Sequence, residues 1–466
     1  MYLPGLDTIV TPTVRLGVTG LARAGKTVFI SALVRNLVGG GRLPFFSANA
    51  ENRIAAAYLE PQPDDDVPRF DYEAHLGELA RDPPEWPQST RHISQLRVTI
   101  EYVSGNFVRR QLGPSYLHLD IVDYPGEWLI DLGLINASFE AWSARTLDLV
   151  RAPHRATAAA PFLAALRAPA AAPDAPLDET EARTLAALYT RFLEDIRRNE
   201  PGLSTLGPGR FLMPGDLAGS PLLTFAPLDV TPDHAAKRGT LAQLMQRRFE
   251  SYKAHVVVPF FRDHFSRLDR QIVLVDALHA LDAGPRAIDE LTVALEACLK
   301  AFRPGRASWL SFILGRRIDR ILFAATKADH LHHASHDRLE AALRLITDRA
   351  AERARYAGAE IGVIAMAALR ATRETDVRHD GERLACIAGV PLPGERIGDK
   401  VFDGRRETVV FPGDLPADPR DAVAHSEGAF QIARFRPPRI TDQNAAVWPH
   451  IRLDRALEFL IGDRLA

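Results

Sequence analysis

Cysteine is nearly absent from this sequence of 466 residues, which contains only Cys298 and Cys386. The two lie far apart and have no partners at metal-ligand spacing, so they predict neither a disulfide framework nor a zinc site. A reducing compartment such as the cytoplasm fits this composition.

The sequence also lacks an excess of charge of one sign. It has 57 Lys and Arg residues and 59 Asp and Glu residues, so its net charge is −2. This balance argues against a protein that coats nucleic-acid phosphates, although a local basic patch is compatible with it. No uncharged apolar stretch reaches the roughly 18 residues that a spanning helix needs, and we see no secretory signal. We expect a cytoplasmic protein without a transmembrane segment, peripheral at the inner membrane at most.

The composition is that of a folded protein, with 46% hydrophobic and 25% charged residues. Near the start, residues 14–19 have the pattern of a β-strand and Val28 to Leu37 that of a helix. Between them lies GLARAGKT, which matches G-x-x-x-x-G-K-[ST] and predicts a loop whose backbone N–H groups bind phosphates. The expected phosphate contacts are Gly20, Arg23, Ala24, Gly25, Lys26 and Thr27, with Lys26 on the β- and γ-phosphates and the Thr27 hydroxyl on Mg²⁺.

A second predicted strand, Ser115 to Asp123, ends in the pattern D-x-x-G, with Gly126 as its glycine. In nucleotide switches this Asp meets Mg²⁺ through water and the Gly amide senses the γ-phosphate. Asp120 is the alternative carboxylate, but it lacks the following glycine. Glu127 stands where small GTPases carry a Gln that orients water; an ionised Glu only accepts hydrogen bonds, so we expect slow intrinsic hydrolysis or help from Arg91 or a partner.

A third strand, Arg320 to Ala325, runs into Thr326-Lys327-Ala328-Asp329, the [NT]-K-x-D pattern of guanine-specific switches. The Asp329 carboxylate can accept from guanine N1–H and its exocyclic amine, with Lys327 over one face of the base and His330 near the other. A strand end with a helix cap at Asp329 is the alternative. Ala367 and Ala368 follow a further strand, Glu360 to Met366, where a backbone N–H can reach the guanine oxygen.

The loop Trp86-Pro-Gln-Ser89-Thr90-Arg91 precedes two paired strands, Arg97 to Tyr102 and Tyr116 to Val122. It stands where switch I lies in such proteins, so Thr90 is expected on Mg²⁺ and Arg91 on the γ-phosphate. A solvated loop explains both residues equally well.

These elements predict an α/β, G-domain-like P-loop NTPase with a doubly wound sheet, built from residues 1–130 and 270–370. Gln271 to Asp276 is a further expected strand, with Leu291 to Phe302 as its crossover helix. Residues 131–269 are expected to form a helical insertion, with helices at Phe139 to Val150, Glu179 to Arg198 and Thr240 to Leu268 and a connector at Ala152 to Pro176. Residues 371–449 are expected to form a small β-containing part, with strands at Arg405 to Phe411 and Phe430 to Phe435, and residues 450–466 a closing helix on the core.

Two smaller signals carry less weight. His330, His332, His333 and His336 invite interpretation as a metal site, but they lie on a loop and a helix start without fixed ligand geometry, so a solvated face is expected. Trp309 to Leu314, flanked by arginines, is interpreted as a packed hairpin or helix rather than a membrane contact.

The strings GLARAGKTVF, WPQSTR, DYPGEW, ATKADH and PHIRLDRALEFLIGDRL resemble the YcjX-like family of bacterial P-loop proteins over nearly the whole chain. The resemblance implies a nucleotide-binding G-like domain with a helical insertion and a stress-linked role. It places nucleotide contacts at Gly20 to Val28, at Trp86 to Arg91 and at Lys327 to His330.

We therefore expect a Mg²⁺-dependent switch that binds guanine nucleotide and hydrolyses GTP to GDP and phosphate, with an unidentified protein or membrane-stress partner and no nucleic acid. An ATPase or kinase, and a module that binds nucleotide without turnover, are the alternatives.

Overall fold

The computed structural model describes residues 11–20, 24–88, 92–105, 110–111, 113–199, 206–231, 233–301, 318–356, 358–440 and 448–466. The chain divides into two compact units. The sheet unit comprises Met1–Tyr124, Leu268–Ile288 and Arg316–Ala466, and the helical unit comprises Pro125–Arg267 and Asp289–Gly315. The division of the chain expected from the sequence, with boundaries near residues 130, 270, 370 and 450, stays a prediction.

The sheet unit is built on a seven-stranded sheet of order β2-β3-β4-β1-β5-β6-β7. Its strands are β1 (Thr13–Gly20), β2 (Ile54–Glu60), β3 (Ser94–Tyr102), β4 (Ser115–Asp123), β5 (Arg270–Val275), β6 (Arg320–Ala325) and β7 (Glu360–Ala365). Strands β4, β1, β5, β6 and β7 run parallel, whereas β3 is antiparallel to β4 and β2 to β3. The expected mixed α/β fold with a mostly parallel central sheet is confirmed.

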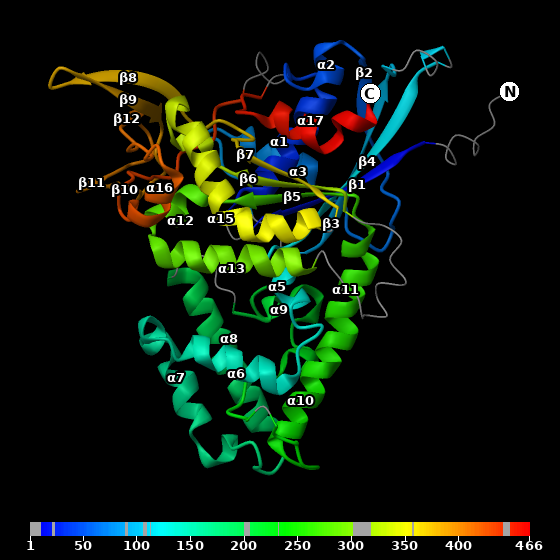
Figure 1. The fold of residues 1–466 in the computed structure, drawn as a ribbon, viewed down its shortest axis with the longest axis vertical. Coiled ribbons are helices and arrows are strands. Elements are labelled where there is room, and N and C mark those ends of the chain that lie inside the picture. The colour runs from blue at the N-terminus through cyan, green and yellow to red at the C-terminus, as the bar shows by residue number, and fades with distance from the viewer. Residues whose placement is uncertain are drawn as a thin grey trace. The chain divides into compact units, whose positions relative to one another are not determined.

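The two faces of this sheet are covered by different helices because side chains alternate along each strand. Leu16 and Val18 of β1 and Leu274 of β5 belong to a core that also holds the apolar faces of α1 (Lys26–Val38) and α17 (Leu453–Ile461). On the other side α15 (His336–Tyr356) packs on β6 and β7 (Figure 1). The unit also contains α2 (Ser47–Ala50), α3 (Tyr72–Leu79), α12 (Ala277–Asp282) and α16 (Pro419–His425), and α13 (Pro285–Ala301) begins in it.

A smaller antiparallel sheet of order β12-β9-β8 follows β7, from β8 (Arg373–His379), β9 (Glu382–Gly389) and β12 (Thr408–Val410). The pair β10 (Arg396–Ile397) and β11 (Lys400–Val401) lies beyond β9. The strand expected at Arg405 to Phe411 is present but shorter, and the strand expected at Phe430 to Phe435 is wrong. Phe435 forms only an isolated bridge to Pro391, which has no N–H to extend a ladder.

The helical unit contains α5 (Trp128–Leu132), α6 (Phe139–Val150), α7 (Ala156–Leu166), α8 (Glu179–Asn199), α9 (Gly209–Leu212), α10 (Leu241–Tyr252) and α11 (Val258–Asp263). The expected helices at Phe139 to Val150 and Glu179 to Arg198 are confirmed. The helical run expected over Thr240 to Leu268 is confirmed over residues 241–263, where a π-turn at Lys253–Val257, next to Pro259, joins α10 to α11. The expected connector at Ala152 to Pro176 contains α7, whose alanines favour a helix.

A buried acid lies among aromatic side chains of the helical unit. Asp131 Oδ1 accepts from the Gly209 amide at 2.7 Å, and Oδ2 accepts from the Tyr252 hydroxyl at 2.6 Å and from the Arg210 amide at 3.3 Å. Burial raises the pKa of Asp131 to about 6, against the opposing effect of these hydrogen bonds.

No helix among the described residues combines the length and the apolar character needed to cross a bilayer.

Tyr252→Phe should therefore destabilise the protein in a pH-dependent way. The folded pKa of Asp131 lies above its ordinary value of 3.8, so the folded state binds the proton more tightly and stability falls as the pH rises from about 4 to 6. The Tyr252 hydroxyl donates to the ionised form, so its loss should cost about 1.5–3 kcal/mol at pH 8 and about 1 kcal/mol at pH 5. Urea unfolding at both pH values measures this.

Tyr189→Phe is the matched control, because the Tyr189 hydroxyl donates to the backbone carbonyl of Gly207 at 2.5 Å. A carbonyl does not titrate, so this variant should lose similar stability at both pH values. Equal losses at pH 5 and pH 8 for Tyr252→Phe would contradict the assignment of a titrating Asp131.

Candidate functional site

The carboxyl ends of the parallel strands meet at one edge of the sheet unit. The register pairs Val18 of β1 with Asp123 of β4, and Gly20 with Leu274 of β5. It also aligns Val275 with Ala325, and Ala325 with Ala365. The segments that follow these strands carry the residues singled out in the sequence, and ligands in open α/β sheets bind at such an edge.

The loop between β1 and α1, residues 20–27, is called the glycine loop here. A Cβ on Gly20 would lie 2.8 Å from Lys26 Cγ and 3.1 Å from Leu274 Cβ, so no larger residue fits. Gly25 has φ +82° and precedes the first residue of α1, Lys26. Its N-cap residue, Gly25, has no side chain to cap α1, and no acidic residue lies in the first turn of α1. Ala24 is buried, Val28 is half-buried, and Arg23 lies outside the described residues.

Asp123 is a buried carboxylate at the end of β4, with 1% exposure. Lys26 Nζ lies 3.2 Å from its Oδ1, and among the described residues neither carboxylate oxygen accepts a hydrogen bond. Burying an ionised carboxylate without hydrogen bonds is costly, so this position fits a cation ligand better than a packing role.

Asp120, the alternative carboxylate, has a different environment. Arg97 Nε and one terminal guanidinium nitrogen donate to its two oxygens at 2.6 and 2.8 Å. This bidentate pair links β3 to β4 and satisfies both oxygens. Asp120 is therefore a structural residue, and Asp123 remains the candidate metal ligand.

The segment before β3 reaches both parts of the candidate site. The Thr27 hydroxyl donates to the Gln88 carbonyl at 3.4 Å, and the Trp86 indole N–H donates to the Phe435 carbonyl at 2.6 Å. Residues 86–88 thus run from the glycine loop to the segment that carries Phe435. Ser89, Thr90 and Arg91 lie outside the described residues, so their expected roles stay predictions.

The backbone after β6 is tightly fixed. The Thr326 amide donates to the Val275 carbonyl at 2.9 Å, and Lys327 has φ 59° in the left-handed region. Lys327 Nζ pairs with Asp276, the residue that follows β5. Burial alone would raise the pKa of Asp276, but the charge of Lys327 and its hydrogen bond outweigh it, and the pKa lies below its ordinary value.

Asp329 is a buried residue that is held from the segment after β7. Its Oδ2 accepts from the Ala371 amide at 2.8 Å, and the Thr372 hydroxyl donates to its carbonyl oxygen. Its carboxylate does not cap a helix N-terminus, because the cap of the 3₁₀ turn Ala328–His330 is Lys327, without a side-chain cap. The contacts leave the helix-cap alternative without support.

His330 lies edge-on to Phe435, with ring centroids 5.4 Å apart. Burial lowers the pKa of His330, so its imidazole is neutral at neutral pH. The edge-on rings of His330 and Phe435 form an aromatic wall beside Asp329.

The structure separates Ala367 from Ala368. The Ala367 N–H donates to the Ile451 carbonyl at 3.1 Å. In return, the Ala367 carbonyl accepts from the Ile451 N–H at 2.8 Å. Its N–H therefore has a partner within the chain, and of the two expected donors we retain Ala368.

Gly126 and Glu127 belong to the helical unit. Glu127 is buried and its Oε1 lies 2.9 Å from a guanidinium nitrogen of Arg197 on α8. Glu127 thus has a cationic partner within that unit, which fits an ionised side chain that only accepts hydrogen bonds.

Two residues that contact the candidate site, Asp276 and Phe435, were not singled out as site residues in the sequence. Asp276 had a signal, since it is a carboxylate directly after a predicted strand of the parallel sheet. Phe435 had none, because its carbonyl and its ring reach the site through tertiary contacts that no sequence pattern marks.

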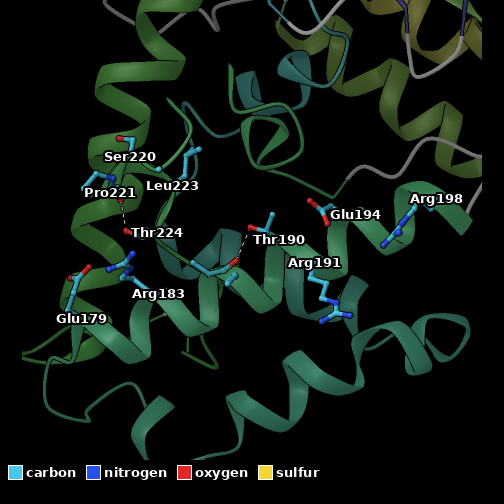
Figure 2. Close-up of a pocket in the computed structure, with 13 residues that line it drawn as sticks. Glu179, Arg183, Thr190, Arg191, Glu194, Arg198, Ser220, Pro221, Leu223 and Thr224 are labelled. Atoms are coloured by element: carbon cyan, nitrogen blue, oxygen red, sulfur yellow. Dashed lines mark hydrogen bonds between the residues drawn. The ribbon is translucent and has the colours of Figure 1, made fainter. Parts of the chain in front are cut away.

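A pocket of about 630 Å³ lies elsewhere, in the helical unit, between α8 and residues 219–224 (Figure 2). It is lined by Arg183, Arg191 and Arg198 together with Glu179 and Glu194. All five of these charged side chains are exposed, and Glu179 also pairs with Arg248 of α10, which does not line the pocket, at 2.5 Å. The pocket contains none of the residues expected to bind nucleotide, so it is not the candidate site.

The fold and this edge of the sheet define a mixed α/β protein with a candidate ligand site at the carboxyl ends of its parallel strands. The profile of the YcjX-like family, DUF463, matches residues 14–465, and the chain belongs to this family. It is 37% identical over 462 residues to the Ras-like GTPase YcjX of Escherichia coli (strain K12), covering 97% of this chain and 96% of the relative. It is 34% identical over 474 residues to the Ras-like GTPase YcjX of Shewanella oneidensis, covering 97% and 94%.

Asp123→Asn should leave the ligand-free protein as stable as the wild type or more stable. The change removes a buried charge whose oxygens accept no hydrogen bond from the described residues, which offsets the loss of a single ion pair with Lys26. Asp120→Asn is the matched control and should lose about 2–4 kcal/mol, because it breaks a bidentate pair with Arg97. Thermal unfolding without nucleotide or divalent metal measures both. A loss for Asp123→Asn as large as that for Asp120→Asn would mean that Asp123 is a structural residue.

Proposed function

We propose that this protein is a Mg²⁺-dependent GTP-binding switch that hydrolyses GTP to GDP and phosphate. The observation that carries the proposal is the buried Asp123 carboxylate, which accepts no hydrogen bond from the described residues and lies 3.2 Å from Lys26, the first residue of helix α1, whose N-cap is Gly25. A negatively charged ligand with a divalent cation accounts for these features together. The anion would face Lys26 and the N–H groups at the start of α1, and the cation would face Asp123. The similarity to two proteins named Ras-like GTPase supports the same class.

In this proposal the glycine loop binds the phosphates. Gly20 and Gly25 allow the backbone to approach closely, the amides of residues 23–27 donate at the start of α1, and Val28 adds a contact behind them. Lys26 exchanges Asp123 for the β- and γ-phosphates. Thr27, Asp123 and Thr90 would hold Mg²⁺, which supplies charge that neutralises the phosphates.

The base is recognised at the other end of the site. Asp329 accepts from guanine N1–H and the exocyclic amine, and the Ala371 amide fixes the orientation of its carboxylate. Lys327 covers one face of the base, His330 with Phe435 and Trp86 forms the wall beside it, and Ala368 donates to the guanine oxygen. Neutral His330 suits this contact because a cation would be desolvated there.

Hydrolysis is expected to be slow without help. Gly126 senses the γ-phosphate, whereas Glu127, paired with Arg197, cannot donate as the usual Gln does. Ser89 and Arg91 are the candidate γ-phosphate contacts, with Arg91 as a finger supplied in cis. A stress-linked role in the cytoplasm, with an unidentified protein or membrane-stress partner, belongs to the same proposal.

The test is a ligand panel. Thermal shifts with GTP, GDP and ATP, each with Mg²⁺, report the base preference, and phosphate release reports turnover. Equal stabilisation by ATP and GTP would favour an ATPase. Tight binding of GTP without phosphate release would favour a module that uses nucleotide structurally.

Lys26→Ala should weaken GDP and GTP binding by about 100-fold or more, because it removes the charge aimed at the phosphates. Equilibrium binding of labelled GDP measures the change, and circular dichroism verifies the fold. Lys400→Ala, which removes an exposed lysine over the ring of Phe402, is the control and should bind normally. Unchanged affinity in Lys26→Ala would refute the phosphate assignment of the glycine loop.

Asp329→Asn should transfer the base preference from guanine to xanthine. The amide oxygen of the variant can keep the hydrogen bond from the Ala371 amide, which leaves the NH₂ group to face the base. Guanine presents donors there and clashes, whereas xanthine presents a carbonyl. We expect a loss of about 2–4 kcal/mol, or roughly 30- to 1000-fold, in GTP affinity. Competition between GTP and XTP measures it, and a variant that still prefers GTP would overturn the base assignment.

A further inference from the structure

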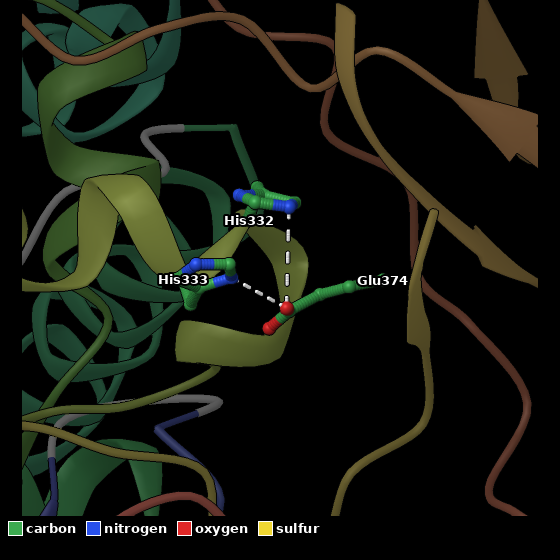
Figure 3. A group of neighbouring side chains, drawn as sticks. All are labelled: His332, His333 and Glu374. Carbon is green, nitrogen blue, oxygen red and sulfur yellow. Dashed lines mark hydrogen bonds and ion pairs between the residues drawn. The ribbon is translucent and has the colours of Figure 1, made fainter. Parts of the chain in front are cut away.

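Two histidines and a glutamate from distant segments meet beside the base loop. His332 and His333 follow Asp329 closely, and Glu374 lies in β8. One donor atom from each residue lies within 4.8 Å of the other two. Figure 3 shows both imidazoles turned toward one carboxylate group.

The two contacts converge on the same oxygen. His333 Nδ1 lies 2.6 Å and His332 Nε2 3.9 Å from Glu374 Oε2. Ligands of a tetrahedral zinc ion lie about 3.3 Å apart, which follows from metal–ligand bonds of about 2.0 Å, so the two distances bracket the required one. The other carboxylate oxygen of Glu374, Oε1, lies 3.6 Å from a guanidinium nitrogen of Arg370. This ion pair holds Oε1, while Oε2 faces the histidines.

We propose that His332, His333 and Glu374 bind one divalent transition-metal cation of the zinc class. Two imidazoles and a carboxylate suit Zn²⁺, Co²⁺ or Ni²⁺, whereas Mg²⁺ and Ca²⁺ prefer oxygen ligands alone. Three protein ligands leave a further position for water. The site is separate from Asp123 and does not depend on the proposed GTPase function.

Binding requires one local change at His332. Its Nδ1 now accepts from the Ala334 amide at 3.3 Å, so the neutral ring carries its proton on Nε2. Ligation through Nε2 moves that proton to Nδ1 and breaks this long contact. His333 needs a similar change, because its Nδ1 donates to Glu374 Oε2 at 2.6 Å and must lose that proton to bind a metal; its ring is 68% exposed, so Nε2 can carry the proton in water.

The cation would join two segments that already meet at Asp329. The Ala371 amide and the Thr372 hydroxyl contact Asp329, and Glu374 lies two residues beyond Thr372. A metal bridge from Glu374 to His332 and His333 therefore closes a short loop of contacts around this residue. Because the cation binds only the folded arrangement, it should raise the unfolding temperature.

The experiment uses the full-length protein without an affinity tag, treated with chelator and free of nucleotide. Calorimetric titration with Zn²⁺ should show one equivalent bound in addition to any site that needs Asp123, Co²⁺ should give a visible absorption band, and the unfolding temperature should rise. His333→Ala and Glu374→Ala should each weaken Zn²⁺ binding by at least about tenfold. His333 is exposed, so its variant keeps the fold.

His379→Ala and Asp123→Asn are the controls. His379 is an exposed histidine on the same strand, paired with Asp380, and its loss should leave this Zn²⁺ equivalent unchanged. Asp123→Asn should retain it as well, which separates this site from a cation at the glycine loop. Wild-type Zn²⁺ affinity in both His333→Ala and Glu374→Ala, or loss of all binding in Asp123→Asn, would overturn the proposal and leave the three residues as a histidine–glutamate ion pair.

Discussion

The buried carboxylate of Asp123 is the constraint on which the end of the sheet depends. Its backbone lies in register with Val18 of β1 on one side and Ser94 of β3 on the other, so it cannot move toward water. Lys26 compensates the charge, yet no hydrogen bond satisfies either oxygen among the described residues. Burying such a charge without hydrogen bonds is costly, and the proposed function accounts for that cost with a cation that the carboxylate binds.

The opposite end of the site depends on residues far along the chain. Asp329 is held by Ala371 and Thr372, Ala367 is paired with Ile451, and Phe435 lies against His330. The part of the chain after β7 is therefore more than an appended sheet, since it sets the orientation of the side chains after β6. The glycine loop needs no such help, because the residues of one β-loop-α segment determine its geometry.

This difference explains what the sequence could predict. β4 and β6 match the expected strands residue for residue, because β6 has the continuous apolar run of a buried parallel strand and β4 alternates apolar residues at Leu117, Leu119 and Ile121. The hairpin of β8 and β9 was missed although Asp380 and Gly381, both at positive φ, form the two-residue turn that Asp-Gly favours. Its first strand, RETDVRH, is largely exposed and lacks apolar alternation. In the candidate site, the predicted residues lie on contiguous motifs, whereas Phe435 reaches the site only through tertiary contacts.

The segment at residues 86–88 connects the two ends unequally. The indole of Trp86 donates to the Phe435 carbonyl at 2.6 Å, whereas the Thr27 hydroxyl reaches the Gln88 carbonyl at only 3.4 Å. Hydrogen bonds weaken with distance, so the contact at Thr27 is the easier one to give up. If Thr27 turns to a cation, as the proposed function requires, little is lost at Gln88 while Trp86 stays anchored.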